Sequence, residues 1–264
     1  MSKKGSKWIV RLLIAEIVLF LLAAGKLFSI YLEYQKGNDA YDALLGYVKE
    51  PDGENKEKEL SAEMQDESSN PYLEVDFNGL KAINPDVIAW VHIPALDISY
   101  PVVQGTDNSY YLHHLFSGEY NINGSIFVDY HNTPDFTDSN TIVYGHNMKN
   151  GSMFGTLDRY QDKALFDQNP CFYIYLPDQI LKYRIFSCYA GRIGSMGYTY
   201  RFPQESDFSE FLDTVLSYSS YETGTEVLTS DKVVTLSTCV NTNRDYRYLV
   251  HGKLDKVIER GRQD

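Results

Sequence analysis

Three residues near the ends of predicted strands have side chains suited to acyl-transfer chemistry. Cys239 ends the apolar run 233–239 and precedes a polar stretch, so a strand would hold its thiol beside an accessible loop. A thiol nucleophile needs a proton acceptor, and His146 follows the predicted strand 141–144 after a glycine. Arg247 begins the last predicted strand, where a hairpin would set its guanidinium beside the thiol. This order predicts a nucleophile, an acid and base, and an oxyanion stabiliser.

Competing interpretations of these residues remain open at the level of sequence. A cysteine at the end of an apolar strand is, on its own, more often a packed core residue than a nucleophile. Arg244 competes with Arg247, although we expect a side chain in the middle of a loop to be held less rigidly than one at the start of a strand. The remaining histidines lie inside predicted strands or among polar residues with no obvious partner: His92, His251, His113, His114 and His131.

The sequence favours no metal or cofactor. Paired histidines or cysteines at zinc-binding spacing, a calcium-loop pattern and a phosphate-binding glycine loop are all missing from it. Cys171 and Cys188 would approach each other if they flanked a turn at residues 177–178, but we expect two reduced, buried cysteines. With only three cysteines in the chain, at least one thiol is unpaired.

The elements that must position these residues are mostly short strands. Runs of β-branched and aromatic residues separated by turn residues begin after residue 71. The predicted strands are residues 87–93, 98–103, 125–128, 141–144, 171–176, 181–190, 232–237 and 247–254. Eight such strands predict a mainly β fold closed into a barrel.

Peripheral helices should interrupt the strands. The clearest is 206–219, where Phe208, Phe211 and Val215 recur on one face and Ser206 is a suitable N-cap. Three shorter helices are expected at residues 76–83, 109–115 and 153–160, and an amphipathic helix over residues 31–49 should pack on the domain.

Residues 8–31 form an apolar stretch of about the length that a helix needs to cross a bilayer. Glu16 and Lys26 interrupt it, but a charge costs roughly 2.5–3.5 kcal/mol at mid-bilayer, and many apolar side chains outweigh that cost. Basic residues precede the stretch or lie at its start: Lys3, Lys4, Lys7 and Arg11. The positive-inside rule therefore predicts a cytoplasmic N-terminus. We expect an uncleaved anchor, because Leu22 fits a small-residue cleavage pattern poorly; a cleaved signal peptide is the alternative.

Charge excludes one large class of partners. The 264-residue chain has a formal net charge of −12, so it lacks the excess of Lys and Arg that binding to a nucleic-acid backbone requires. Residues 50–70 contain eight acidic residues and two lysines with few apolar side chains, which is typical of a solvated linker.

Three segments together resemble the sortase family, cysteine transpeptidases of bacterial surfaces. They are the Thr-Leu-Ser-Thr-Cys run at 235–239, His146 in Tyr-Gly-His-Asn, and Arg247. The longer run Gly-His-Asn-Met-Lys-Asn-Gly-Ser-Met-Phe at 145–154 and the predicted helix before the cysteine strand resemble class B members. Val240 departs from those class B enzymes that have an acidic residue after the cysteine. The resemblance covers about residues 72–254.

This resemblance implies an eight-stranded sortase-type β-barrel with peripheral helices, preceded by an N-terminal transmembrane helix. Cys239 would be the nucleophile, His146 the general acid and base, and Arg247 the stabiliser of the oxyanion. The substrate groove would be lined by Asn108, Leu112, Tyr144, Ser237, Thr238 and Tyr198, with the region 195–200 closing over the peptide.

It also implies partners and a location. The partners would be surface-protein sorting-signal peptides (NPxTN-like or PxTG-like), cleaved after Thr, and an amine of a peptidoglycan precursor such as lipid II. We expect a single-pass membrane protein of a Gram-positive bacterium: a cytoplasmic tail (1–7), a signal anchor (8–31), an extracellular helix and acidic linker (32–71) and an extracellular catalytic domain (72–264).

Other functions stay open. A pilin-polymerising sortase would use the same residues, and so would a hydrolytic cysteine peptidase. The papain-like order of residues does not fit the latter, because Cys239 comes late in the chain and after a strand. A non-catalytic wall-binding domain is the alternative that the 22 tyrosines favour.

Overall fold

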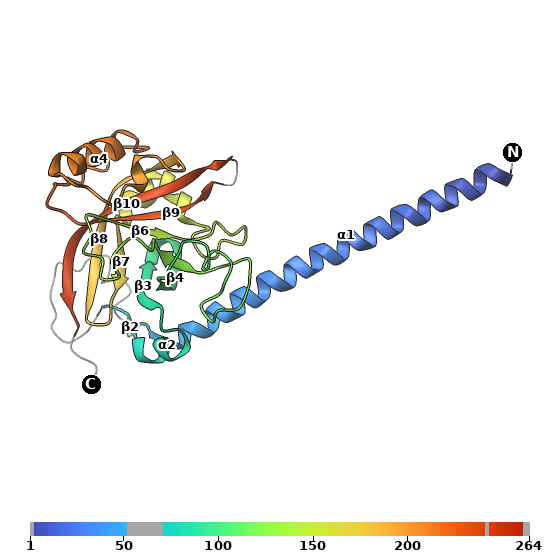
Figure 1. Ribbon diagram of the computed structural model, residues 1–264, viewed down its shortest axis with the longest axis horizontal. Helices are drawn as coiled ribbons and strands as arrows, with labels where there is room; N and C mark the ends of the chain where they lie inside the picture. Colours follow the sequence, from blue (N-terminus) through green and yellow to red (C-terminus); the bar gives the residue numbers. More distant parts are fainter. Residues whose placement is uncertain (1–2, 52–70, 241–242, 261–264) are drawn as a thin grey trace.

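The computed structural model describes residues 3–51, 71–240 and 243–260, and a closed β-barrel forms its centre (Figure 1). The barrel strands are β3 (Val87–Ile93), β4 (Ile98–Val103), β5 (Ile126–Val128), β6 (Asn140–Tyr144), β7 (Cys171–Tyr175), β8 (Gln179–Arg192), β9 (Val233–Val240) and β10 (Asn243–Glu259). Their order around the barrel is β10-β8-β7-β3-β4-β5-β6-β9. The predicted eight-stranded barrel is therefore confirmed, with parallel pairs at β4–β5 and β6–β9.

The inside of the barrel is filled by aromatic and β-branched side chains. Val91, Phe172 and Tyr183 lie on one face of the sheet by their strand pairing and are each fully buried. Gly252 lies at a register shift in β10, and a Cβ there would come within 2.5 Å of the Phe172 ring. This glycine lets a large ring pack directly against the strand backbone.

The last strand begins earlier than the sequence indicates. Arg247 was expected to be its first residue, but β10 begins at Asn243, which pairs with Val240 of β9. Between the Asn243–Val240 pair and the Arg247–Cys239 pair the register of the two strands is irregular. Arg244, expected in mid-loop, lies within the strand.

The predicted amphipathic helix is α4 (Glu205–Ser217), which buries Phe208, Phe211, Leu212 and Val215 on the outside of the barrel. Its N-cap is Gln204, so the choice of Ser206 was wrong. Gln204 and Asp207 form a reciprocal capping box, which satisfies two backbone donors and places the helix start earlier.

The shorter helices are predicted with less accuracy. α2 (Phe77–Ile83) follows its cap Asp76 as expected. Residues 109–115 form turns instead of a helix, because Asp107 caps two backbone amides and the chain then pairs with residue 125. In the predicted helix 153–160, Met153 has a φ of +57°, and only a 3₁₀ turn, Leu157–Gln161, forms; α3 (Lys163–Gln168) was not predicted.

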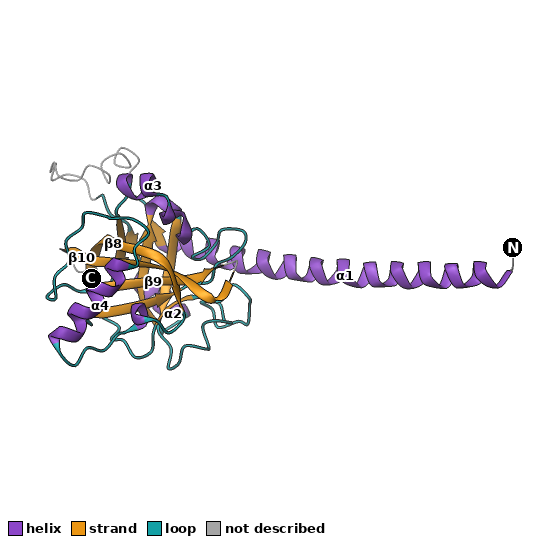
Figure 2. Cartoon of the chain, turned by 90° about the horizontal axis from the view of Figure 1, so that it is seen from above, coloured by secondary structure: helices purple, strands orange, loops and turns teal. Residues whose placement is uncertain are grey.

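The N-terminal helix α1 (Lys3–Leu44) is a single rod that extends far from the barrel (Figure 2). Its apolar stretch is exposed, and it is long and apolar enough to cross a membrane. The expected helix over residues 31–49 is the end of this same rod, followed by a 3₁₀ turn and by β1 (Val48–Lys49), which pairs with β2 (Glu74–Val75). Most of the acidic linker, residues 52–70, lies outside the described residues.

Candidate active site

The β9–β10 hairpin sets Cys239 directly opposite Arg247. The two residues are register partners in an antiparallel pair. Side chains at such positions share one face of the sheet, with Cβ atoms about 4.5–5.5 Å apart. The pairing of the two strands therefore places the Cys239 thiol and the Arg247 guanidinium on neighbouring backbones.

The loop that follows β6 carries His146 to the same end of the barrel. β6 pairs in parallel with β9, so both strands end on the same side. The Gly145 amide donates to the Ser237 carbonyl at 3.1 Å, and the Asn147 side-chain amide donates to the Cys239 carbonyl at 2.6 Å. These hydrogen bonds fix the loop to the strand of the cysteine on both sides of His146.

His146 has a defined proton arrangement. Its Nε2 lies 2.7 Å from the Leu112 carbonyl oxygen. A carbonyl can only accept, so Nε2 carries a hydrogen and Nδ1 is the nitrogen left to exchange a proton. Burial lowers the pKa of His146; the hydrogen bond to Leu112 opposes this shift, and the nearby His113 and Arg247 side chains add to it.

One cleft of about 440 Å³ contains every residue that the sequence singled out for the site. Cys239, His146 and Arg247 line it. The predicted groove residues line it as well: Asn108, Leu112, Tyr144, Ser237, Thr238 and Tyr198. Tyr198 closes one side, because its hydroxyl lies 2.8 Å from Ser237 Oγ and its ring stacks toward Tyr144 at 6.4 Å between centroids.

Sequence reasoning missed the buried carboxylate of this cleft. Asp129 accepts hydrogen bonds from Asn108 Nδ2 at 2.8 Å, Tyr144 Oη at 2.9 Å and His131 Nδ1 at 2.8 Å. Burial alone would raise the pKa of Asp129, but its hydrogen bonds with His131, Tyr144 and Asn108 outweigh that effect and lower the pKa. His131 also stacks on Tyr200 at 4.8 Å.

His131 was expected to lack a partner, and that expectation is wrong. Asp129 and His131 lie two residues apart, a spacing that indicates a hydrogen-bonded turn only once the strand end at Val128 is known. Other cleft residues that the sequence did not identify are Phe127, Gly145, Ile193 and Gly194, whereas Tyr200 belongs to the region 195–200 that was expected to close over the peptide.

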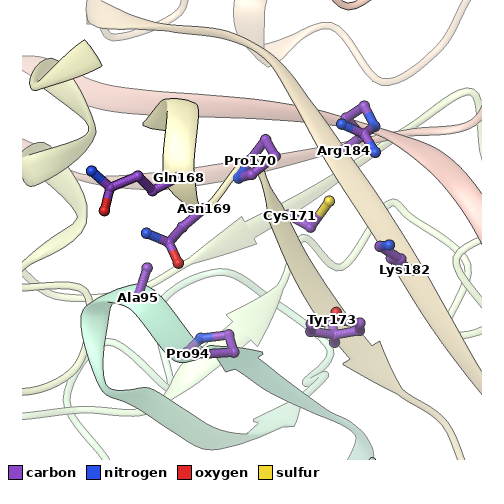
Figure 3. A pocket seen from close by; sticks show the side chains of 9 residues that line it. All are labelled: Pro94, Ala95, Gln168, Asn169, Pro170, Cys171, Tyr173, Lys182 and Arg184. Atoms are coloured by element: carbon purple, nitrogen blue, oxygen red, sulfur yellow. The ribbon is translucent and has the colours of Figure 1, made fainter. Parts of the chain in front are cut away.

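The other two cysteines have different surroundings. Cys171 and Cys188 are unpaired, as expected, although Cys171 is only half-buried. Burial raises the pKa of both thiols; Lys182 and Arg184 oppose the shift at Cys171 without cancelling it. Cys171 lines a separate cavity of about 160 Å³ between β7, β8, residues 94–95 and the end of α3 with the segment that follows it, and none of the described residues that line it is a histidine (Figure 3).

Among the described residues, no group of three or more His, Cys, Asp or Glu side chains could hold a metal ion. The described side chains that line the cleft instead offer a thiol, an imidazole, a guanidinium, hydroxyls and aromatic rings. Such a set is suited to covalent acyl transfer from an extended peptide.

The chain is similar to known proteins along most of its length. A family model described as the sortase domain matches residues 91–255. Sortase B of Listeria monocytogenes is 37% identical over 216 residues, which cover 81% of this chain and 82% of that relative.

Solved structures agree with this match. Sortase B from Bacillus anthracis in complex with AAEK1 superposes with a TM-score of 0.70 at 30% identity, covering 87% of this chain and 100% of that chain. A Staphylococcus aureus sortase B–substrate complex has a TM-score of 0.64 at 28% identity and covers 70% of this chain and 85% of that chain. The chain therefore belongs to the sortase family, is of the sortase B type, and is a cysteine transpeptidase.

Proposed function

We propose that this transpeptidase cleaves the C-terminal sorting signal of surface proteins after Thr and transfers the acyl group to an amine of a peptidoglycan precursor. The observation that carries the proposal is the direct pairing of Cys239 with Arg247 at the mouth of a cleft that also contains His146. Thiolate, cation and imidazole then lie around one reacting carbonyl.

In the first half-reaction, the Cys239 thiolate forms a bond to the carbonyl carbon of the Thr residue. Arg247 stabilises the negative oxygen of the tetrahedral intermediate. As that intermediate collapses, the carbon–nitrogen bond breaks and His146 gives a proton from Nδ1 to the leaving amine. A thioacyl-enzyme and the released C-terminal peptide result.

In the second half-reaction, the acceptor amine attacks the thioacyl carbon, and His146 takes the proton from the attacking nitrogen. The carbon–sulfur bond then breaks, and the thiolate is regenerated with a new amide bond. Because burial lowers the pKa of His146, the imidazole is mostly neutral at neutral pH. A neutral imidazole suits this second step, whereas only a minority of molecules hold the imidazolium that the first step uses.

The residues that line the cleft support the proposal that its substrate is a peptide of the NPxTN-like or PxTG-like class. Tyr144 and Tyr198 present aromatic rings on which a proline ring could stack, and Leu112 adds an apolar contact. Asn108 and Ser237 offer polar groups to a peptide backbone or side chain. The sortase B from Staphylococcus aureus has been solved as a substrate complex, which supports peptide binding in the equivalent cleft of this chain.

The membrane is proposed as the second partner, through α1. Residues 8–31 would span the bilayer, with the N-terminus in the cytoplasm and the barrel outside the cell. A helix rises 1.5 Å per residue, so residue 41 would stand about 15 Å beyond residue 31. A rod of this length holds the barrel near the membrane surface, where a lipid-linked precursor such as lipid II would present its amine.

Transfer to an amine is tested with the full-length chain in detergent micelles. The enzyme is mixed with a small library of NPxT- and PxTG-containing peptides and an oligoglycine or diamine acceptor, and the products are identified by mass spectrometry. We expect an amide between the Thr carbonyl and the acceptor with wild type and with Cys171→Ala, and none with Cys239→Ala. Peptide hydrolysis without any transfer product would overturn the transpeptidase assignment in favour of a peptidase.

A further inference from the structure

The end of α1 beyond the apolar stretch packs on the two loops that hold His146. The first is loop 110–125, and Tyr41 is the main contact. Tyr41 is buried, its hydroxyl donates to the Gly124 carbonyl at 2.6 Å, and it lies 3.0 Å from Ser125 Oγ. The contact is therefore an ordered, desolvated one rather than a loose surface approach.

Gly37 makes the closest approach between the helix and this loop. A Cβ at Gly37 would lie 2.3 Å from Asn123 Nδ2 and 2.9 Å from Asn121 Oδ1. Asn121 Nδ2 also donates to the Glu33 carbonyl at 3.0 Å. The helix backbone here lies against the buried side chains of Asn121 and Asn123, so a side chain at position 37 would have to displace them.

The second loop, 145–155, is held by the same turns of α1. Asn150 Nδ2 donates to Asn38 Oδ1 at 3.2 Å. The Tyr41 ring packs edge-on against Tyr100 at 5.4 Å, and the Tyr100 hydroxyl accepts from the Met153 amide at 3.1 Å. Both loops that meet at His146 therefore rest on one short piece of helix.

Two residues of the first loop, Gly124 and Leu112, lie directly against His146. Gly124 has a φ of +55°, and a Cβ there would come within 2.7 Å of the Leu112 carbonyl and 2.9 Å of His146 Cδ2. That Leu112 carbonyl accepts the hydrogen bond from His146 Nε2. The path from α1 to the imidazole thus runs through Tyr41, Gly124 and Leu112.

We infer that residues 33–44 of α1 are a positioning element for His146, in addition to being the end of the anchor. The helix presses loop 110–125 against the imidazole and so fixes the carbonyl that selects its tautomer. This inference rests on the proposed role of His146 as the acid and base. Gly37 and Tyr41 are positioning residues, because neither touches the cleft.

The test uses the full-length chain in micelles and two glycines of the same helix. Gly37→Ala forces a Cβ into loop 110–125, whereas Gly25→Ala is the matched control, because nothing lies within 4 Å of a Cβ at that position. Both substitutions favour helix formation equally, so the control removes that effect. Tyr41→Phe deletes only the hydroxyl and serves as a milder second variant.

Two readouts separate positioning from general damage. Single-turnover acylation by a sorting-signal peptide should slow about ten-fold or more in Gly37→Ala, with KM unchanged and a folded far-ultraviolet spectrum. Tyr41→Phe should slow it by less, and Gly25→Ala should match wild type. The His146 imidazole is followed independently by NMR titration, and its pKa should move in Gly37→Ala and Tyr41→Phe but not in Gly25→Ala.

The NMR readout does not depend on turnover. If the wild type forms no acyl-enzyme but the His146 titration still moves in Gly37→Ala, the proposed function fails and the positioning inference stands. The inference itself would be overturned if the folded Gly37→Ala variant had the His146 titration and the acylation rate of wild type. It would also be overturned if the loss of acylation activity equalled the fraction of unfolded protein.

Discussion

Asp129 shows how a single buried carboxylate can organise a peptide-binding cleft. It holds Asn108, Tyr144 and His131 at once, and these side chains line the wall along which a substrate would run. Hydrogen bonds to a charged group contribute about 1.5–3 kcal/mol each, so neutralising the carboxylate should release more than one of them.

Asp129→Asn should raise KM for the sorting-signal peptide about ten-fold while kcat changes little, because a loss of about 1.4 kcal/mol of ground-state binding corresponds to that factor. Steady-state kinetics give the split, and the rate of Cys239 alkylation by iodoacetamide should be unchanged. Asp135→Asn is the matched control, since Asp135 is an exposed carboxylate of the same loop that does not line the cleft. Equal effects of the two substitutions would contradict this role.

Two histidines, the fully buried His251 and the partly buried His92, make the stability of the fold depend on acid. Burial lowers the pKa of His92 to about 4 and that of His251 to about 3, whereas both would titrate near 6.5 in the unfolded chain. Below pH 6.5 the unfolded state therefore binds more protons than the folded state, so stability falls as the pH drops.

Between pH 6 and 4, each histidine should lower the free energy of unfolding by up to about 1.4 kcal/mol per pH unit, which urea unfolding at several pH values measures. The Thr235 hydroxyl lies 2.9 Å from His251 Nδ1. The substitution His251→Asn keeps a hydrogen-bond partner for this hydroxyl and removes the group that titrates. This variant should be less stable at pH 7 and show a flatter slope in acid. If the unfolding free energy of this variant has the same slope against pH as that of wild type, the folded state does not hold His251 in its neutral form.

At the scale of elements, the loop after β6 decides where His146 lies. Gly145 packs so tightly on Phe154 that a Cβ would come within 2.5 Å of the ring, and the Phe154 amide donates to the His146 carbonyl at 2.9 Å. The Phe154 side chain therefore packs directly against Gly145, the first residue of the loop, and fixes its position.

Gly145→Ala should push Phe154 away and displace the imidazole, lowering kcat by about ten-fold to a hundred-fold, because a misplacement of about 1 Å is enough for such a loss. The double variant Gly145→Ala/Phe154→Leu removes the clash and should recover much of the activity. The measurement is single-turnover acylation at matched folded fraction. No recovery in the double variant would show that the glycine matters for another reason.

Strands were predicted well from sequence and short helices poorly, for physical reasons. β3 and β4 match their predicted bounds, because apolar residues there are bounded by proline and turn residues. Residues 109–115 have helical spacing, but the side chain of Asp107 and pairing with residue 125 satisfy the backbone instead. Such competition between local and long-range hydrogen bonds cannot be read from spacing alone.

The candidate site was predictable where motifs and the family resemblance pointed to it, and not where it depends on contacts made only in the folded chain. All nine predicted residues line the cleft: Tyr144 and His146 end or follow β6, Ser237, Thr238, Cys239 and Arg247 lie on the β9–β10 hairpin, Asn108 and Leu112 lie in the loop before β5, and Tyr198 lies in the 3₁₀ turn Met196–Tyr198 after β8. Asp129 and His131 were missed, since their pairing becomes visible only in three dimensions. Catalytic and binding roles of the nine residues stay predictions.

At the scale of the whole molecule, one rod joins the apolar stretch to the barrel. α1 continues without a break from Lys3 to Leu44, and its last turns are part of the packed domain. The assignment of residues 1–7, 8–31, 32–71 and 72–264 to tail, anchor, linker region and catalytic domain stays a prediction.

The orientation of this rod predicts where Cys239 can be labelled. In intact cells, a membrane-impermeant maleimide should modify the Cys171→Ser variant, because the proposed orientation places the cleft outside the cell. Cys239→Ala in the same background should remove the labelling, since Cys188 is buried. Labelling that requires cell lysis would contradict the proposed orientation.

Cys239 is proposed to carry the acyl group, and intact-protein mass spectrometry detects such an acyl-enzyme without relying on the second half-reaction. The full-length enzyme is mixed with the sorting-signal peptide library without any acceptor amine and quenched in acid. We predict a mass increase equal to the peptide portion ending in Thr, mapped to Cys239, absent in Cys239→Ala and released by hydroxylamine as expected for a thioester. A folded enzyme that shows no such adduct with any peptide, or an adduct that persists in Cys239→Ala, would contradict the account.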